Sequence, residues 1–203
     1  DKKRLREGVR KSLSMMAVII FPMMIGMMVV ARPLVVVMIG EKWLPCVPYL
    51  QLLCIVGLLY PLHLINLNAL NAQGRSDLFF NLEIIKKINI VIAIALTYRW
   101  GITAMIIGQI VTSVIAYYLN SYFTARFLNY RLLDQIKDVM PAFVMSCIMG
   151  LTVYGVTFFS MLNNYILLLM QIITGFSLYI GLCYFTRNES FLEALALLKV
   201  RLI

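Results

Sequence analysis

Long apolar runs and short polar stretches alternate along this chain of 203 residues. An apolar run of about 20 residues is long enough to cross a bilayer as a helix. In lipid the backbone must satisfy its own hydrogen bonds, so such runs joined by short loops predict an all-α bundle. The pattern predicts an integral membrane protein with six transmembrane helices, over residues 13–39, 46–72, 78–98, 102–123, 139–160 and 165–185.

A short basic segment precedes the predicted bundle. In residues 1–12 and the start of the first span, Leu5, Val9 and Leu13 lie four residues apart, so one apolar line runs along a cationic helix. This pattern predicts an amphipathic helix at the cytoplasmic surface of the membrane.

A second amphipathic segment, residues 186–203, follows the bundle. Ser190 and Glu193 have the spacing of a capping box. The apolar residues after this start share one helical face, which predicts a short cytoplasmic tail helix at the membrane interface: Phe191, Leu195, Leu198 and Leu202.

The positive charges are sorted between the two sides of the predicted bundle. When Arg32 is counted with the second connecting stretch and Lys86 and Lys87 with the third, the first, third, fifth and last stretches carry 6, 3, 3 and 3 Lys and Arg residues, and the other three carry 2, 1 and 0. Because cytoplasmic loops are enriched in Lys and Arg, both termini are predicted to be cytoplasmic. The net charge of +9 lies beside apolar spans. Membrane orientation and anionic lipids therefore explain it better than nucleic acid does.

Composition supports a membrane protein and argues against an enzyme. Hydrophobic residues make up 62% of the chain and charged residues 13%, which is rare in a soluble domain of this length. The four cysteines show no metal-ligand spacing, so no metal site is expected. The chain contains no nucleophile triad and no phosphate-binding glycine loop, and no span contains a pair of carboxylates. No cofactor is predicted, and a coupling cation, proton or sodium, is left open.

Polar side chains inside the spans are the candidates for function, because each is costly in hydrocarbon. At about 100° per residue, the second span carries two polar faces. One holds His63, Asn66 and Gln73, and the other Asn68, Asn71 and Arg75. Two interpretations are open for them: hydrogen bonds between helices, or the lining of a water-filled cavity that contacts substrate.

The third and fourth spans carry similar alternatives. Lys86 and Lys87 follow Glu83 at helical spacing. One interpretation is local ion pairing, with the lysine stems extending to the headgroup layer. The other is a basic pocket for a phosphate-bearing headgroup. A small and polar stripe on the fourth span predicts close helix packing or cavity lining: Gln109, Thr112, Ser113, Ala116 and Asn120.

Five of the six prolines lie inside predicted spans, and three of these carry predictions. Pro22 and Pro61 interrupt helical hydrogen bonding in mid-span, so each is a hinge in a transporter or a kink that packing tolerates. Pro141 falls in the predicted first turn of the fifth helix, after a loop over residues 124–138, where proline is tolerated.

Four motifs stand out in the first half of the chain: GEKWLP at 40–45, VPYLQ at 47–51, LNALNAQGRSDLF at 67–79 and LEIIKK at 82–87. These motifs strongly resemble those of bacterial polysaccharide exporters, namely the O-antigen and exopolysaccharide flippases of the Wzx type. This family belongs to the multidrug/oligosaccharidyl-lipid/polysaccharide exporter superfamily. The resemblance is most specific over residues 1–90.

The resemblance implies that this chain is the C-terminal portion of a larger exporter with two helical lobes. The opening at Asp1, without an initiator methionine, also suggests a fragment. The family transfers polyprenyl-pyrophosphate-linked oligosaccharide across the bacterial inner membrane by alternating access. Cationic and polar residues would then bind the pyrophosphate and sugar, and the candidates in this chain are Lys86, Lys87, Arg75, His63, Asn66 and Gln109.

The resemblance also implies partners: the lipid-linked oligosaccharide, membrane lipids, the missing N-terminal lobe and polysaccharide-assembly proteins. Two other functions stay open. One is a multidrug-type exporter of the same superfamily, which would favour acidic residues deep in the lobe. The other is a membrane subunit that anchors a polysaccharide-assembly complex without transporting anything.

Overall fold

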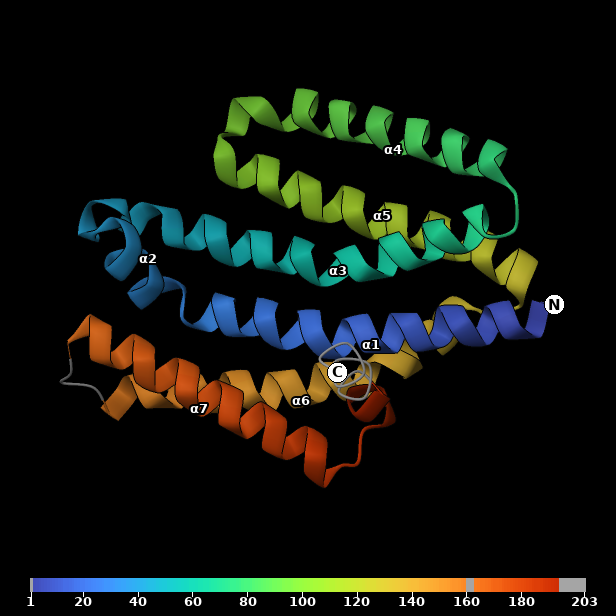
Figure 1. Ribbon diagram of the computed structural model, residues 1–203. Helices are drawn as coiled ribbons and strands as arrows, with labels where there is room; N and C mark the ends of the chain where they lie inside the picture. The colour runs from blue at the N-terminus through green and yellow to red at the C-terminus, as the bar shows by residue number, and fades with distance from the viewer. Residues whose placement is uncertain (1, 160–162, 194–203) are drawn as a thin grey trace. The chain divides into compact units, whose positions relative to one another are not determined.

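The structure, a computed structural model, describes residues 2–159 and 163–193, and within these ranges it is helical and contains no strand. Figure 1 shows the elements in chain order. The helices are α1 (Lys2–Val29), α2 (Ala31–Ile39), α3 (Val47–Asn71), α4 (Ser76–Thr97), α5 (Ile102–Leu128), α6 (Leu132–Val156) and α7 (Asn164–Phe185). Short 3-10 turns lie between them: η1 (Glu41–Cys46), η2 (Tyr98–Trp100) and η3 (Thr157–Phe159).

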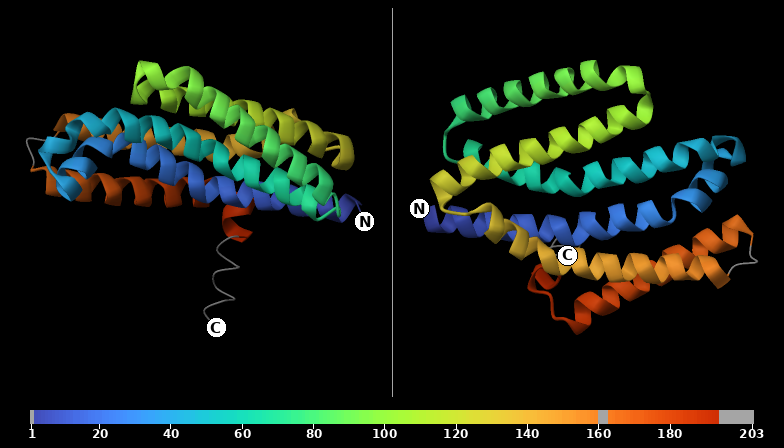
Figure 2. Two further views of the ribbon diagram at one scale, coloured as in Figure 1. Left: turned by 90° about the horizontal axis from the view of Figure 1, so that it is seen from above. Right: turned by 180° about the vertical axis from the view of Figure 1, so that it is seen from behind.

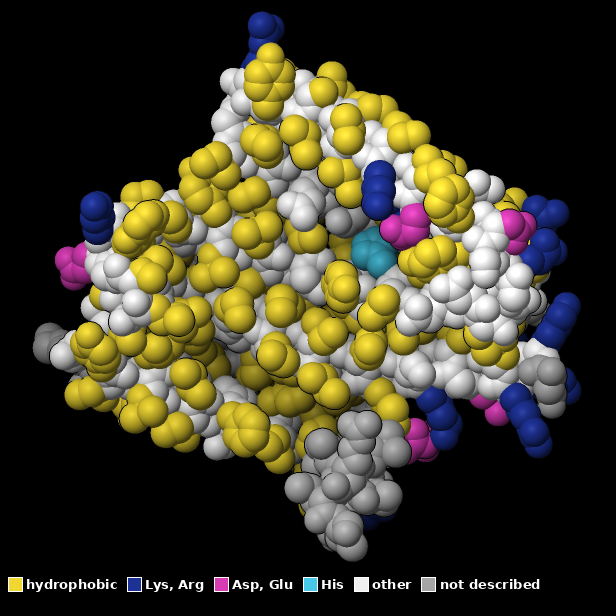
Figure 3. Space-filling model, turned by 45° about the horizontal axis from the view of Figure 1, so that its top comes forward, with side chains coloured by type: hydrophobic (Ala, Val, Ile, Leu, Met, Phe, Trp, Pro, Cys, Tyr) yellow, Lys and Arg dark blue, Asp and Glu magenta, His cyan; other side chains and the backbone are white. Residues whose placement is uncertain are grey.

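Five segments of the described chain are long and apolar enough to cross a membrane, so the protein is an α-helical multi-pass membrane protein. They are Lys2–Val29, Glu41–Asn71, Ile102–Leu128, Leu132–Val156 and Asn164–Phe185. Helix α4 has the length of a span, but Glu83, Lys86 and Lys87 lie in its middle. These charges make α4 different from the other long helices, although its surface also carries many exposed isoleucines. In the space-filling view, hydrophobic side chains cover most of the face shown and charged ones form small groups (Figure 3).

The chain divides into two compact units. Unit 1 contains Asp1–Leu13 and Ile55–Asp138, and unit 2 contains Ser14–Cys54 and Val139–Ile203. The boundary cuts through α1, α3 and α6, so these three helices contribute to both units. Each unit has its own buried residues.

The main feature of unit 1 is an antiparallel hairpin of α4 and α5, which lie side by side in Figures 1 and 2. Gly101 makes the turn between them with a φ of +86°, which favours glycine. Gly108 of α5 lies so close to α4 that an added Cβ would stand 3.3 Å from Thr97 Cγ2. A small residue at this position therefore allows the two helices to approach closely.

The connections on either side of this hairpin are short. Gly74, with a φ of +71°, turns the chain between α3 and α4. Asn129, with a φ of +51°, ends α5 in the left-handed conformation that asparagine tolerates at a helix end. The predicted loop over residues 124–138 is therefore mostly helical, and only residues 129–131 connect α5 to α6.

Close packing of α1, α6 and α7 builds unit 2. The rings of Phe21 on α1 and Phe143 on α6 meet edge to face, with centroids 6.0 Å apart. A Cβ added at Gly150 of α6 would lie 2.7 Å from Ile25 Cγ2 on α1. Glycine at this position therefore lets α1 and α6 approach closely.

The first predicted span, 13–39, contains two helices. Helix α1 ends at Val29 and α2 begins at Ala31. Proline has no N–H group, and inside a helix its ring clashes with the carbonyl group four residues earlier. For Pro33 this is the carbonyl group of Val29. The helix is interrupted at Val30, and Pro33 lies in the first turn of α2, where its missing donor costs little.

Pro22 lies inside α1 without ending it. Its missing N–H leaves the carbonyl of Val18, four residues earlier, without its helical donor. The Tyr179 hydroxyl of α7 donates a hydrogen bond of 2.7 Å to this carbonyl. Packing within unit 2 therefore restores the bond that Pro22 removes.

Two local predictions are wrong. Helix α6 begins at Leu132, so Pro141 lies inside the helix and not in its first turn. At the tail, Asn188 Oδ1 accepts a hydrogen bond of 3.2 Å from the Phe191 backbone N–H, so Asn188 caps the turn in place of Ser190. The predicted tail helix continues into residues 194–203, which lie outside the described residues.

Candidate functional site

A charged pair on α4 forms the first part of the candidate site, in unit 1. The Lys86 ammonium donates a hydrogen bond to the Glu83 carboxylate one turn earlier, and the two form an ion pair. Only 15% of the Lys86 side chain and 34% of the Glu83 side chain are exposed. Lys86 is thus a largely buried cation in an otherwise apolar helix, neutralised by its own neighbour.

The only histidine of the chain lies near this pair. The charges of Lys86 and Glu83 both act on His63 of α3. The His63 ring meets the Tyr117 ring of α5 edge to face, with centroids 6.2 Å apart. Its Nδ1 atom is buried and has no hydrogen-bond partner among the described residues. Three helices of unit 1 therefore bring a cation, an acid and an unpaired imidazole nitrogen together.

Gln135, near the start of α6, is the centre of a buried polar network. Its side chain is fully buried. Its Oε1 accepts hydrogen bonds from Asn66 Nδ2 at 2.8 Å and from the Tyr117 hydroxyl at 3.3 Å. Its Nε2 donates to Asn66 Oδ1 at 3.1 Å, to Ser121 Oγ at 3.0 Å and to the Tyr130 carbonyl at 3.3 Å. One amide thus joins α3, α5 and α6.

Asn120 lies next to this network on α5 and behaves differently. It is fully buried, like Gln135. Neither its Oδ1 nor its Nδ2 has a hydrogen-bond partner among the described residues. The sequence placed Asn120 in a packing stripe, and the structure buries it together with Ala116 of that stripe.

A second, more exposed cluster lies where α1 and α6 begin. Arg10 donates to Asp138 Oδ1 through Nε at 3.0 Å and forms an ion pair through Nη2 at 2.8 Å. The Tyr130 hydroxyl donates to Asp138 Oδ2 at 2.7 Å. Burial, and then this hydrogen bond, raise the pKa of Tyr130 above its ordinary value, so its hydroxyl remains a donor at neutral pH.

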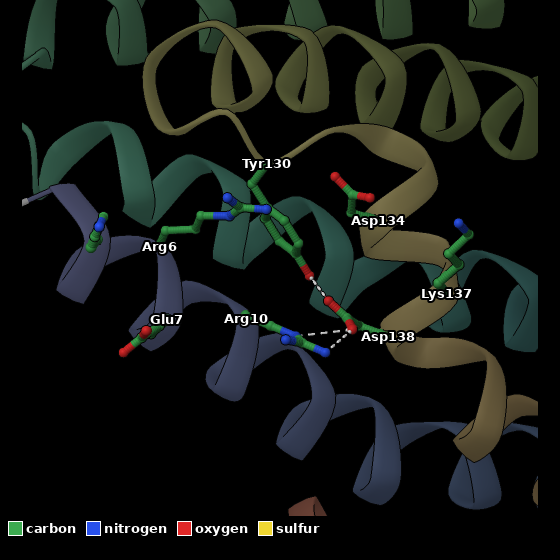
Figure 4. A pocket seen from close by; sticks show the side chains of 8 residues that line it. Arg6, Glu7, Arg10, Tyr130, Asp134, Lys137 and Asp138 are labelled. Atoms are coloured by element: carbon green, nitrogen blue, oxygen red, sulfur yellow. Dashed lines mark hydrogen bonds and ion pairs between the residues drawn. The ribbon is translucent and has the colours of Figure 1, made fainter.

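This cluster borders a pocket of about 580 Å³, shown in Figure 4. Its walls come from the first turns of α1, from Tyr130 and from the first turns of α6. Seven of the eight lining residues are charged: Lys3, Arg6, Glu7, Arg10, Asp134, Lys137 and Asp138, with Tyr130 as the eighth.

The residues predicted to bind substrate fall into two groups. His63, Asn66 and Lys86 are buried or half-buried in unit 1. Lys87, Arg75 and Gln109 are exposed, and the Arg75 guanidinium lies 5.0 Å from the centre of the Phe127 ring.

The two predicted polar faces of the second span separate in the same way. His63, Asn66 and Gln73 are buried or half-buried, whereas Asn68, Asn71 and Arg75 are exposed. The proposed hinges Pro22 and Pro61 both lie inside continuous helices.

The sequence analysis missed Gln135, Tyr130 and Asp138 as structural centres, because it placed them in a loop. A usable signal was present. Leu132, Gln135 and Val139 follow at spacings of three and four residues, which is the period of one helical face.

Comparisons with known proteins point to polysaccharide biosynthesis. The family described as "Polysaccharide biosynthesis protein" matches residues 1–48. The chain is 29% identical over 162 residues to the teichuronic acid biosynthesis protein TuaB of Bacillus subtilis (strain 168), which covers 75% of the chain and 32% of TuaB. It is 33% identical over 124 residues to the lipopolysaccharide biosynthesis protein WzxC of Escherichia coli (strain K12), which covers 59% of the chain and 25% of WzxC.

A third relative is described as an uncharacterized membrane protein in the cps region of Klebsiella pneumoniae. It is 26% identical over 205 residues, which covers 100% of the chain and 42% of that protein. The chain therefore spans less than half the length of each of these curated relatives. No solved structure matches the chain. The family match over residues 1–48 and the named relatives confirm the resemblance to polysaccharide-biosynthesis proteins that was drawn from the sequence motifs.

Proposed function

We propose that the protein transfers a polyprenyl-pyrophosphate-linked oligosaccharide from the cytoplasmic to the periplasmic leaflet of the bacterial inner membrane, by alternating access. The names of the relatives support a role in polysaccharide biosynthesis. The apolar helices support a membrane location. Because the chain spans less than half of each relative, the activity is proposed for the whole protein, of which this chain forms one part.

The proposed topology has six spans with both termini in the cytoplasm. Five of the six proposed spans are the strongly apolar segments, and helix α4 is the remaining one. In the predicted span over residues 78–98 its two lysines lie in the first half, and their long stems extend toward the cytoplasmic headgroup layer. The bias of Lys and Arg toward alternate connections supports this orientation.

The observation that carries the proposal is the Lys86–Glu83 pair beside His63. An ionisable group inside a membrane helix is costly and usually marks a substrate or ion pathway. Glu83 neutralises Lys86 while the site is empty, which makes the buried cation tolerable. An incoming pyrophosphate would compete for Lys86 with the acid, since phosphate oxygens are strong acceptors for charged donors.

The remaining candidates have secondary roles in this proposal. The unpaired Nδ1 of His63 would contact the sugar or the pyrophosphate, and the Asn66 side chain would do so only after release from its hydrogen bonds to Gln135. Lys87, Arg75 and Gln109 would contact substrate at the surface of unit 1. Pro22 and Pro61 are proposed as hinges for the change of access.

The test is polysaccharide export in cells in which the protein carries Lys86→Gln, Lys87→Gln or both. Lys86→Gln is expected to reduce export about tenfold or more, because a buried charge-assisted hydrogen bond to phosphate is lost. Lys87→Gln is expected to have a smaller effect, since Lys87 is exposed. The matched control is Lys42→Gln with Arg99→Gln, which removes two exposed cations near helix ends and should leave export unchanged.

The same experiment separates the alternatives. Unchanged export by the Lys86→Gln/Lys87→Gln variant, at an unchanged protein level, would contradict the proposed substrate site. Loss of drug resistance without loss of export would indicate a multidrug exporter. If the protein is an assembly subunit, polysaccharide export should fall only when the protein is absent, and substitutions of Lys86 and Lys87 should have no effect on export.

A further inference from the structure

The charged pocket of unit 1 has no role in the proposed transport. It lies where the charged first turns of α1 meet Tyr130 and the start of α6 (Figure 4). Its volume of about 580 Å³ is within the range of small-molecule sites. Its walls are almost entirely charged, so an apolar ligand is excluded and a charged or strongly polar one is expected.

The acidic side chains of the pocket are already occupied or turned away. Asp138 accepts hydrogen bonds from Arg10 and Tyr130. Asp134 Oδ2 accepts a hydrogen bond of 3.3 Å from the Arg131 backbone N–H, as an acid in the first turn of a helix often does. In Figure 4, Glu7 points away from Tyr130. The Arg10–Asp138 pair offsets one of the three negative charges, so three cations remain against the carboxylates of Glu7 and Asp134 and the lining as a whole carries a net charge of +1.

Three cations of the pocket remain available. In the described part of the chain, Lys3, Arg6 and Lys137 have no ion-pair partner. The Arg6 guanidinium lies 6.0 Å from the centre of the Tyr130 ring, a distance at which cation and ring attract. Because Asp138 holds the Tyr130 hydroxyl, the ring is a fixed support for Arg6.

The position of the pocket along α1 indicates where its ligand lies. The basic turns of α1 end at Lys11, and the helix is almost wholly apolar from Leu13 onward. In a membrane helix this transition marks the level of the headgroups. Phosphate is the anionic group that lipids present at that level, and basic residues there attract it.

We propose that this pocket binds a phosphate group, with Lys3, Arg6 and Lys137 as donors to its oxygens. The source is the headgroup of an anionic lipid or a soluble phosphate compound, which share this chemistry. Arg10, Asp138 and Tyr130 position the pocket but do not contact the ligand. The proposal needs only that the protein lies in a membrane, and it is independent of the proposed transport.

The test uses the purified full protein in nanodiscs of phosphatidylcholine with a trace of spin-labelled phosphatidylglycerol. The immobilised fraction of the label is compared with that of spin-labelled phosphatidylcholine. The variant Lys3→Gln/Arg6→Gln/Lys137→Gln should reduce the selectivity for phosphatidylglycerol about tenfold, since it removes the three proposed charged donors to the phosphate oxygens. The matched control, Lys2→Gln/Arg126→Gln/Arg131→Gln, removes three exposed cations that do not line the pocket. It should keep the selectivity.

A second arm identifies the source of the phosphate. If inorganic pyrophosphate releases the labelled lipid from the unaltered protein, and does so only with the pocket cations present, the pocket binds phosphate from either source. If the lipid stays bound, the headgroup is the ligand. Equal losses of selectivity in the two triple variants, or no loss in either, would overturn the proposal. If the variant Lys3→Gln/Arg6→Gln/Lys137→Gln does not stay monodisperse, Arg6→Gln and Lys137→Gln are measured as single variants. The proposal is then overturned if neither single variant loses selectivity for phosphatidylglycerol.

Discussion

The interiors of unit 1 and unit 2 are stabilised by different kinds of interaction. Within the described residues, unit 1 buries five polar side chains and unit 2 buries two. Those of unit 1 are Asn66, Asn120, Ser121, Thr124 and Gln135, and those of unit 2 are Ser146 and Gln171. Unit 2 relies instead on close contacts of its helices, as at Gly150 against Ile25.

This difference indicates which unit carries specific chemistry. Close packing of small residues needs no polar group and suits a scaffold in a membrane. Buried amides and charges are costly in the same environment and are retained where they have a structural or functional role. The Gln135 network and the Lys86–Glu83 pair both lie in unit 1. We therefore expect substitutions of buried polar groups to affect unit 1 and substitutions of buried glycines to affect unit 2.

The largest effect is expected from Gln135→Leu. The leucine keeps most of the side-chain volume but leaves Tyr117, Ser121 and the Asn66 carbonyl oxygen without the Gln135 amide. The free energy of unfolding should fall by about 3 kcal/mol, because each buried polar group without a partner costs about 1–3 kcal/mol. The measurement is unfolding of the purified protein in mixed detergent micelles by titration with a denaturing detergent.

Gln109→Leu is the control for this substitution, since Gln109 is an exposed glutamine on α5. It should change the unfolding free energy by less than about 0.5 kcal/mol, as surface substitutions usually do. Equal effects of the two substitutions would show that the Gln135 network does not hold unit 1 together.

The helices of both units could be predicted from the sequence far better than their ends. Apolar runs located the long helices of the described residues, because length and hydrophobicity decide which segments can enter a bilayer. The break after Val29 was missed, since the apolar run continues through it and only Pro33 marks it. The early start of α6 was missed for the opposite reason, because its first turns contain polar residues.

The candidate site could be predicted only in part, since its partners lie far apart in the sequence. Asn66 and His63 stood out as polar residues in an apolar run. The partner of Asn66, however, is Gln135, which is 69 residues away and lies in a segment that resembled a loop. Charge and spacing show that a polar group is buried, but only the packing of α3, α5 and α6 shows what it contacts.

An intermediate effect is expected from Gly150→Ala in unit 2. The added Cβ would lie 2.7 Å from Ile25 Cγ2, which is too close unless α1 or α6 shifts. Overpacking of this kind should lower the unfolding free energy by about 2 kcal/mol. Gly155→Ala on the same helix is the matched control, because no atom lies within 4 Å of its added Cβ. It should stabilise the helix slightly, since alanine is the better helix former. A loss of stability as large in Gly155→Ala would mean that helix contact is not what makes Gly150 necessary.

The smallest effect, and one of opposite sign, is expected from Asn120→Leu. Asn120 is as deeply buried as Gln135, but neither atom of its side-chain amide has a partner among the described residues. Replacing an unpaired polar group by an apolar one of the same branched shape removes a desolvation cost and loses no hydrogen bond. The unfolding free energy should therefore rise, by up to about 1 kcal/mol. If Asn120→Leu instead destabilised the protein as much as Gln135→Leu, Asn120 would have a partner in the folded protein. The polar character of unit 1 would then extend along α5 beyond the network that Gln135 joins.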